Sequence, residues 1–256
     1  SALLANNVHL VGRSFKYHRP RGIMTSGSEE PNAIVQINPG SERTEPNVRA
    51  TEVEIYEGLE ASSQNCWPSV EFDVGGINNF ISPIIPAGFY YKTFMWPKKL
   101  WYSLYEPAIR FSAGLGKSPT QPDPELYDHN HLHCDVLVVG GGISGIIAAG
   151  ISADNGNNTV LIDDKNSLGG STIYQNDENI KINNEISSSW LDKKIKELKN
   201  KQNLTIKHRT SVAAYHSYNY LLARENLADH KSLDKRLNKL RQRLWKIRAK
   251  KVILAT

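Results

Sequence analysis

The stretch CDVLVVGGGISGIIAAGISADNG, residues 134–156, decides the fold of this chain. Its first seven residues form a nearly continuous apolar run, as in a strand that is buried on both faces of a parallel sheet. Small and apolar residues follow at helical spacing, and Asn155-Gly156 is a signal for the end of a helix. Residues 159–163, TVLID, then read as a second strand. The stretch therefore predicts a β-α-β unit with short connections.

The glycines of GGGISG, residues 140–145, fit the pattern G-x-G-x-x-G between the predicted strand and helix. Gly140 permits a tight turn, Gly142 lets the backbone approach a pyrophosphate, and Gly145 allows close packing of helix against strand. The helix N-terminus would offer N–H groups and a partial positive charge to the phosphates. The alternative interpretation is a glycine-rich turn without a ligand.

An acidic residue ends the second strand, because Asp163 lies 18 residues beyond Gly145. A carboxylate there can accept hydrogen bonds from both ribose hydroxyls and repels a 2′-phosphate, which favours NAD or FAD over NADP. Lys165 counts against a complete exclusion of NADP. Residues 168–171, LGGS, follow at the distance seen in flavoproteins with two dinucleotide sites, where a Gly-Gly turn lets the chain pass close to the cofactor.

The remainder of this region continues the same pattern. Residues 187–200 predict a helix with a serine N-cap. Its apolar face would hold Trp190, Leu191, Ile195 and Leu198. The basic tail predicts a helix to about Arg241, and then strands, because apolar and basic residues alternate over residues 245–250. KVILAT, residues 251–256, is the expected returning strand.

The first half of the chain has a different character. Residues 33–37 and 51–56 are strand-like runs between Pro and Gly clusters. Residues 81–110 form an aromatic arm, whose helical part is expected to begin after Pro97. Residues 111–133 contain three closely spaced prolines and predict a linker.

The loop HLVGRSFKYHRPRGIMTSG, residues 9–27, interleaves cations with aromatic residues. Such a pattern occurs in proteins that bind single-stranded nucleic acid. The net charge of +5 suits a phosphate-bearing partner and an acidic partner subunit equally. A basic loop that is exposed to solvent and binds no partner is a further alternative for residues 9–27. For the cations of residues 231–251, a solvent-exposed face is the preferred interpretation. We predict no nucleic-acid partner.

The sequence offers little for metal or covalent chemistry. In an extended HNHLHC the side chains of His129, His131 and His133 would share one face at about 6.6 Å per step, which rarely suits one zinc ion. We read this segment as a polar linker and predict no metal. Glu29 and Glu30 are paired acids that we expect in an exposed loop. We find no nucleophile–base arrangement, so the catalytic residues stay unassigned.

Composition points to a globular protein, with 39% hydrophobic and 22% charged residues. Two cysteines are too few for a disulfide framework or a cysteine-ligated cluster, which favours a reducing, cytoplasmic location. No apolar run is long enough to span a membrane. The chain opens without methionine in a helical pattern and stops in a strand, so we expect a fragment whose targeting signal could not be seen.

Several of these stretches closely resemble the alpha subunit of heterotetrameric sarcosine oxidase: VGRSFKYHRPRGI, EEPNA, AGFYYKTFMWP, YEPAIRFSAGLGKSP, HCDVLVVGGGISG and RLWKIRAKKVILAT. The resemblance implies an α/β chain in three parts. Residues 1–110 would be a ferredoxin-like (α+β) domain that lacks its N-terminus. Residues 111–133 would be the linker, and residues 134–256 an incomplete Rossmann-like FAD/NAD(P)-binding domain.

The resemblance also implies an activity, the oxidative demethylation of sarcosine to glycine, formaldehyde and hydrogen peroxide, or methylenetetrahydrofolate when folate is present. FAD would lie on the beta subunit, FMN at the alpha–beta interface and NAD on this chain, with gamma and delta as further partners. The tetrahydrofolate domain would lie on the missing C-terminal part. The implied NAD-binding residues are Gly140, Gly142, Ile143, Ser144, Gly145, Asp163, Asp164, Lys165, Gly169, Gly170, Ser171 and Val212.

Related cyanide-forming and amino-acid dehydrogenase subunits carry a [2Fe–2S] cluster in the first domain, through cysteines soon after a similar RPRGI. Residues 24–33 of this chain, MTSGSEEPNA, contain no cysteine. Because such clusters require thiolate ligands, we predict no cluster. The large subunit of an N-methylglutamate dehydrogenase or another amine or amino-acid dehydrogenase complex remains an alternative, as does a non-catalytic assembly module.

Overall fold

The computed structural model describes residues 2–84, 88, 96–174 and 180–256. Much of the predicted aromatic arm, residues 85–87 and 89–95, lies outside the described residues. The chain divides into two compact units, residues 1–124 and 125–256. Each unit is described by itself below.

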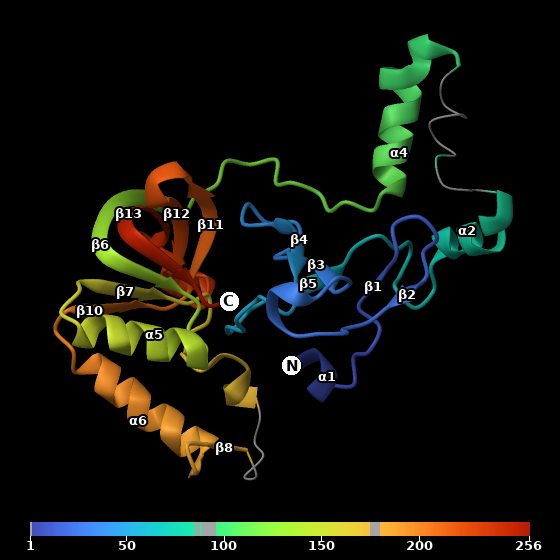
Figure 1. Ribbon diagram of the computed structural model, residues 1–256. Helices are drawn as coiled ribbons and strands as arrows, with labels where there is room; N and C mark the ends of the chain where they lie inside the picture. Colours follow the sequence, from blue (N-terminus) through green and yellow to red (C-terminus); the bar gives the residue numbers. More distant parts are fainter. Residues whose placement is uncertain (1, 85–87, 89–95, 175–179) are drawn as a thin grey trace. The chain divides into compact units, whose positions relative to one another are not determined.

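The second unit is built on a six-stranded mixed sheet in the order β10-β7-β6-β13-β12-β11 (Figure 1). Strands β10, β7, β6 and β13 run parallel, whereas β13, β12 and β11 pair antiparallel. The strands of this sheet are β6 (Leu126–Val139), β7 (Thr159–Ile162), β10 (Leu204–Lys207), β11 (Thr210–His216), β12 (Tyr220–Asn226) and β13 (Leu240–Leu254).

Helices cover one face of the parallel strands. Helix α5 (Ile143–Asp154) joins β6 to β7, and α6 (Ser187–Lys199) precedes β10, so the predicted β-α-β unit is confirmed. The short elements of this unit are η6 (Gly170–Tyr174), β8 (Lys181–Ile182), β9 (Glu185–Ile186), η7 (Ser217–Asn219) and α7 (Leu233–Arg236).

The apolar run of β6 is buried on both of its faces, as its sequence predicts. Val136 and Val138 pack with Ile146 of α5 and Trp190 of α6. Leu137 lies in a second core, together with residues of β12 and β13. The buried residues of that second core are Cys134, Leu137, Val139, Val160, Ile162, Leu221, Ala223, Ile247 and Ala249.

Strand β6 begins earlier than the sequence predicts. Residues 126–133 read as part of a linker, but in the structure they form the first half of β6 and pair with β13 from Leu126 to Val139. Pairing explains the difference, because backbone hydrogen bonds to β13 hold this polar half of β6 extended. Such pairing with a distant segment cannot be read from the local sequence.

The tail prediction was partly wrong. Residues 240–254 form one strand, and the helix before it spans only Leu233–Arg236 rather than reaching Arg241. The alternation over residues 245–250 is confirmed, because Ile247 and Ala249 are buried and Arg248 and Lys250 are exposed. The predicted helix over residues 187–200 is also confirmed, but Ile186 and not a serine is its N-cap.

The first unit contains a small antiparallel sheet in the order β4-β3-β5. Its core holds Val11, Ala33, Val35 and Ile37, which confirms the strand predicted over residues 33–37. The elements of this part are α1 (Ala2–Ala5), β1 (Gly12–Arg13), β2 (Pro20–Arg21), η1 (Gly27–Glu29), β3 (Ile34–Ile37), β4 (Glu45–Arg49), β5 (Ala61–Ser63), η2 (Val74–Gly76), α2 (Ile77–Phe80) and η3 (Ser82–Ile84).

The strand predicted over residues 51–56 was wrong. Strand β4 already occupies one edge of β3 and β5 the other, and the chain turns where the N–H of Glu52 donates to Arg49. After Pro97 the chain is helical as predicted. That segment contains η4 (Lys98–Leu100), the π-helical turn η5 (Trp101–Tyr105) and α4 (Glu106–Ser112).

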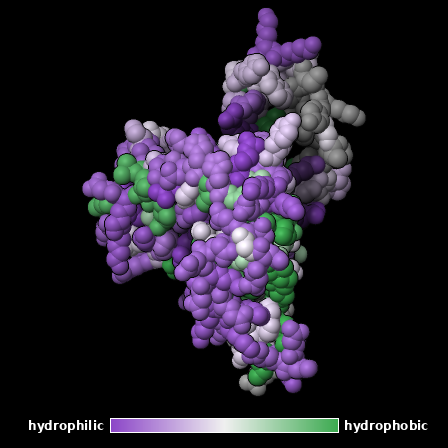
Figure 2. All heavy atoms as spheres, turned by 60° about the vertical axis from the view of Figure 1, so that its left-hand side comes forward, coloured by the Kyte–Doolittle hydropathy of each residue, from purple (hydrophilic) through white to green (hydrophobic). Residues whose placement is uncertain are grey.

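Hydrophilic side chains dominate the face shown in Figure 2, with smaller hydrophobic groups between them. Among the described residues, no helix has both the length and the apolar character needed to cross a membrane.

Candidate functional site

The glycine loop lies where β6 ends and α5 begins. Gly140 has a φ of +105°, a conformation that favours glycine, and a Cβ there would overlap the carbonyl oxygen of Ala255. A Cβ on Gly145 would overlap the carbonyl oxygen of Gly140. Both glycines are therefore required by the protein's own packing, since the loop, the helix and the end of β13 meet there.

Gly142 differs from its neighbours. It is the N-cap of α5 and, as a glycine, has no side chain that could cap the helix, and an added Cβ would meet no atom of the described residues within 4 Å. The fold itself therefore does not require glycine at this position. Open space in front of a twelve-residue helix, whose first N–H groups have no intrahelical acceptor, suits an approaching anion.

Asp163 holds the glycine loop in place. Its side chain is 8% exposed, and its Oδ2 accepts a hydrogen bond from the Gly141 N–H at 2.5 Å. Oδ1 accepts from the Lys165 N–H at 2.8 Å. Each carboxylate oxygen can accept a further bond, so a ribose contact would add to this internal role rather than replace it. The predicted ribose contact stays a prediction.

The second glycine pair lies against the first loop. The N–H of Gly169 donates to the Gly141 carbonyl at 2.8 Å, and a Cβ on Gly170 would lie 3.1 Å from the Gly142 Cα. The turn that leads into η6, where Ser171 lies, therefore borders the open space at Gly142.

The remaining residues predicted for the site are distributed around this loop. Ile143 and Ser144 form the start of α5, and Ser144 is exposed. Lys165 Nζ forms a partly exposed ion pair with Asp164 at 3.3 Å. Val212 lies in β11 at an irregularity of its pairing with β12, and is partly buried against the second core.

One residue near this loop was missed from the sequence. His208 follows β10 directly, and its Nδ1 is buried without a hydrogen-bond partner within the described parts of the chain. Burial lowers the pKa of this imidazole, partly offset by the charge of Asp163, so the ring is neutral at pH 7. A polar residue directly after a parallel strand was the available signal.

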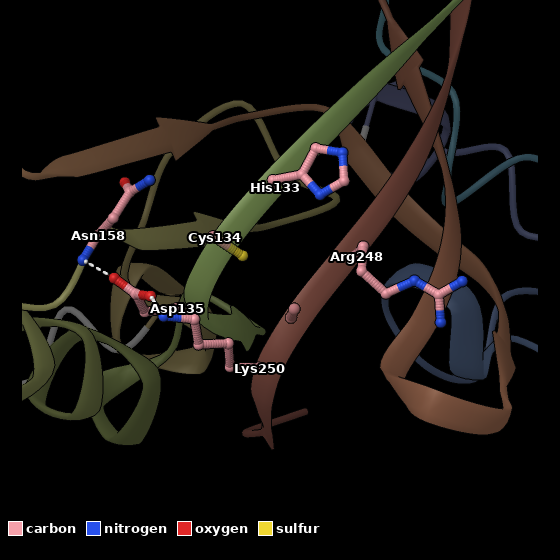
Figure 3. Close-up of a pocket in the computed structure, with 7 residues that line it drawn as sticks. His133, Cys134, Asp135, Asn158, Arg248 and Lys250 are labelled. Carbon is pink, nitrogen blue, oxygen red and sulfur yellow. Dashed lines mark hydrogen bonds and ion pairs between the residues drawn. The ribbon is translucent and has the colours of Figure 1, made fainter.

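A shallow hollow is lined by residues of β6 and β13 and by Asn158, which precedes β7 (Figure 3). Asp135 accepts a hydrogen bond from the Asn158 N–H at 2.9 Å and pairs with Lys250 at 2.7 Å. Burial, assisted by the charge of Asp135, raises the pKa of the Cys134 thiol to about 11. The thiol is therefore protonated at neutral pH and is a poor nucleophile.

The three histidines of HNHLHC lie in β6, not in a linker. In its register with β13, His129 lies opposite Leu244, His131 opposite Lys246 and His133 opposite Arg248. Neighbouring cations disfavour a metal cation on this face. The prediction that no metal binds there stays a prediction.

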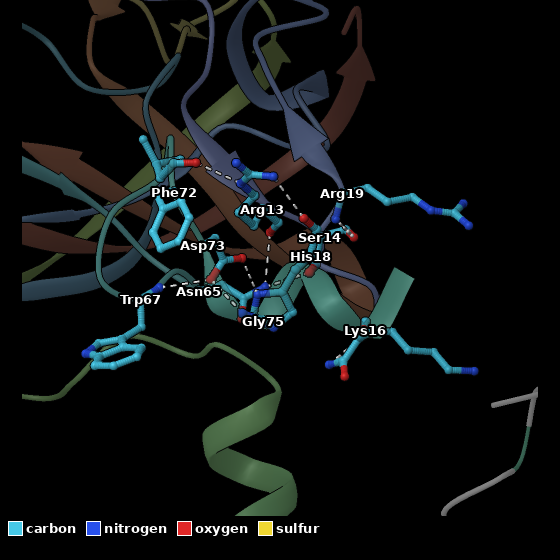
Figure 4. Close-up of polar contacts among 12 residues, drawn as sticks. Arg13, Ser14, Lys16, His18, Arg19, Asn65, Trp67, Phe72, Asp73 and Gly75 are labelled. Atoms are coloured by element: carbon cyan, nitrogen blue, oxygen red, sulfur yellow. Dashed lines mark hydrogen bonds and ion pairs between the residues drawn. The ribbon is translucent and has the colours of Figure 1, made fainter. Parts of the chain in front are cut away.

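Two basic residues of the loop in the first unit, Arg13 and His18, make contacts within that unit (Figure 4). The Arg13 guanidinium donates to the carbonyls of Val70 and Glu71 at 2.8 and 3.0 Å. His18 Nδ1 lies 2.6 Å from the buried carboxylate of Asp73. These contacts fix the loop against residues 70–73, so Arg13 and His18 have a structural role that requires no nucleic acid.

In comparisons with known proteins, part of each unit matches a protein family. Residues 1–66 match the family of 2Fe-2S iron-sulfur cluster binding domains, and residues 135–240 match the FAD dependent oxidoreductase family. The predicted fold class, a ferredoxin-like domain followed by a Rossmann-like one, is thereby confirmed. The L-proline dehydrogenase from P. horikoshii has the same fold, with a TM-score of 0.54 and 17% identity, covering 100% of this chain and 36% of that one.

Curated relatives align with the whole of this chain. The sarcosine oxidase subunit alpha of Rhizobium meliloti (strain 1021) is 45% identical over 256 residues, which are 100% of this chain and 25% of that protein. The sarcosine oxidase subunit alpha of Corynebacterium sp. (strain U-96) is 30% identical over 258 residues, 100% of this chain and 22% of that protein. The chain thus spans about a quarter of the length of these relatives.

The descriptions of the two matched families name a 2Fe-2S cluster and FAD, and the residues of this chain suit only one of these two kinds of cofactor. The glycine loop and the space at Gly142 fit a dinucleotide. An iron–sulfur cluster does not fit, because [2Fe–2S] centres of this kind are held by four cysteine thiolates. The matched residues 1–66 contain one cysteine, Cys66.

Proposed function

Because this chain is related over its whole length to alpha subunits of sarcosine oxidase, we propose that it forms the dinucleotide-binding part of such a subunit. The observation that carries the proposal is the contrast among the loop glycines. Gly140 and Gly145 are required by internal packing, whereas a Cβ on Gly142 would meet open space as far as the described part of the chain extends. Glycine at that position is accounted for by a ligand that approaches the backbone closely.

NAD is the proposed ligand. When bound, it supplies an acceptor or donor of hydride. The chain's own residues would bind and orient it: the start of α5 faces the phosphates, Asp163 braces the loop, and Gly169 and Gly170 leave room beside it. The remaining residues proposed for contact with NAD are Ile143, Ser144, Asp164, Lys165, Ser171 and Val212.

FAD in the same site is the second candidate. The observation that favours it is the match of residues 135–240 to the FAD dependent oxidoreductase family. The loop geometry serves either dinucleotide, since both present a pyrophosphate and an adenosine ribose.

We propose that the complete enzyme removes the methyl group of sarcosine by oxidation and yields glycine with hydrogen peroxide and formaldehyde or methylenetetrahydrofolate. The beta, gamma and delta subunits would be its partners, with FAD on beta and FMN at the alpha–beta interface. Amine oxidation would then occur outside this chain.

Oxygen consumption and peroxide formation by the full-length protein with its copurifying partners test this proposal. Sarcosine is expected to give hydrogen peroxide in a one-to-one ratio with the oxygen consumed, whereas N-methylglutamate and proline give none. Turnover of N-methylglutamate, or turnover that needs an artificial electron acceptor instead of oxygen, would assign the protein to a dehydrogenase complex.

A further inference from the structure

The loop of residues 24–33 folds around one buried carboxylate. Glu30 is 0% exposed, although the sequence predicts it in an exposed loop with Glu29; that expectation was wrong for Glu30 and right for Glu29. The Glu30 carboxylate accepts four backbone hydrogen bonds. Oε2 accepts from the N–H groups of Met24 and Thr25, both at 2.7 Å. Oε1 accepts from those of Asn32 and Ala33, at 2.8 and 3.3 Å.

Convergent backbone N–H groups of this kind form an anion-binding concavity, a feature of many phosphate and iron–sulfur sites. The loop lies within the residues that match the 2Fe-2S cluster binding family, yet it contains no cysteine. We propose that the carboxylate of Glu30 serves as the internal anion of this loop, in the place that an iron–sulfur cluster fills in the cluster-binding family. The first unit then keeps the fold of a cluster domain without an electron carrier.

The electrostatics of the loop agree with a permanent charge. Burial by itself would raise the pKa of the Glu30 carboxyl, but the four N–H donors outweigh burial and lower this pKa below its ordinary value. Glu30 is therefore ionised at neutral pH. A buried carboxylate without such donors would be strongly unfavourable, so the charge and the loop conformation depend on each other.

The carboxylate also ties an exposed loop to the core. Met24 and Thr25 are exposed, whereas Ala33 is fully buried in the core beside Val35. Thr51 Oγ1 donates to the Gly27 carbonyl at 2.6 Å and holds the middle of the loop. Loss of the carboxylate would release both ends of the loop and leave four N–H groups without their acceptor.

Chemical rescue tests this role in the full chain. Glu30→Ala empties the space among the four donors, and Glu29→Ala is the matched control because Glu29 is adjacent and exposed. We expect Glu30→Ala to lower the ratio of folded to unfolded protein at least about tenfold, since hydrogen bonds to a charged acceptor are lost. Formate should restore part of the loss, and chloride at the same ionic strength should not.

Equal stability of the two variants, or equal effects of formate and chloride, would overturn the proposal. If Glu30→Ala does not fold, Glu30→Gln gives the second test. Its neutral amide keeps the size of the side chain but only one acceptor oxygen, so the N–H groups of one pair, either Met24 and Thr25 or Asn32 and Ala33, should exchange with solvent at least about tenfold faster than in wild type. Unchanged exchange would contradict the proposal.

Metal analysis of the wild-type protein tests the other half of the proposal. Protein that has been purified without oxygen should contain no stoichiometric iron or acid-labile sulfide. Stoichiometric iron and sulfide that are lost when Cys66 is replaced by serine would overturn it.

Discussion

Replacement of Gly142 by valine should abolish dinucleotide binding while the fold survives. A Cβ at this position meets no atom within 4 Å among residues 2–84, 88, 96–174 and 180–256, and its φ of −70° is accessible to every residue. The expected loss of stability is that of a poorer N-cap, about 1 kcal/mol or less. The branched side chain would instead fill the space in front of α5.

The size of the binding defect follows from the contacts that the side chain would block. Displacing a pyrophosphate from two backbone N–H donors forfeits two charge-assisted hydrogen bonds, about 3–6 kcal/mol in total. Such a loss weakens the affinity by about 100-fold or more. Equilibrium titration of full-length protein with NAD, and separately with FAD, measures the defect, and thermal unfolding without ligand checks the fold.

Two other glycines provide controls. Gly150→Ala lies in the same helix, where its Cβ would be 3.4 Å from a Leu198 methyl, and it should leave the affinity unchanged. Gly145→Ala should lower both stability and affinity, because its Cβ would overlap the Gly140 carbonyl. A Gly142→Val protein that binds NAD and FAD as tightly as wild type would refute the assignment of this loop as the dinucleotide site.

Three further predictions follow from single groups. Asp163→Ala should weaken NAD binding by about 1–3 kcal/mol and loosen the loop, because Gly141 loses its acceptor; calorimetric titration measures this, and an unchanged affinity would contradict it. Cys134 should react with iodoacetamide at pH 8 about 100-fold more slowly than an ordinary thiol, because its pKa of about 11 lies two units above 9.0; labelling at the rate of free cysteine would disprove it. The folded-state pKa of Glu30 is depressed, so its stabilisation is complete above its ordinary value of 4.5 and is lost as pH falls through the lower folded value. Unfolding free energies of wild type and Glu30→Gln should therefore differ at pH 7 and converge below pH 4.5, and a constant difference would count against this role.

The parallel half of the second unit could be predicted because its residues carry local signals. The apolar run before Gly140 is buried on both faces, and Asn155-Gly156 ends α5 as predicted. Gly140 and Asp163 could also be predicted as members of the candidate site, because Gly140 opens the turn after the first strand and Asp163 follows the second strand directly. Periodicity and turn chemistry are encoded within a few residues of each position.

The interpretations that failed depend on distant partners. The polar segment from Leu126 to His133 has no strand period of its own and becomes a strand because β13 pairs with it along its whole length. Thr51 to Tyr56 has a strand-like period but finds both edges of β3 already occupied. Neither fact is visible in the local sequence, because strand pairing joins residues far apart in the chain.

The sequence indicated which residues belong to the candidate site better than it indicated their hydrogen bonds within the protein. Asp163 was singled out for a ribose, whereas the structure shows its two oxygens already bonded to the backbone of the loop. Glu30 was expected in solvent, because an acidic pair carries no sign that four backbone N–H groups converge on one of its members. Hydrogen bonds to the backbone depend on conformation, which the residue types alone do not reveal.

The most direct test of the central claim is to identify the small molecules that the native protein retains. Full-length protein is purified with its copurifying partners, denatured in acid, and its released ligands are identified by mass spectrometry. The account predicts NAD together with flavin in the wild type, and loss of the NAD alone in the Gly142→Val protein. Wild-type protein that releases no dinucleotide, or a Gly142→Val protein that retains its NAD, would contradict it.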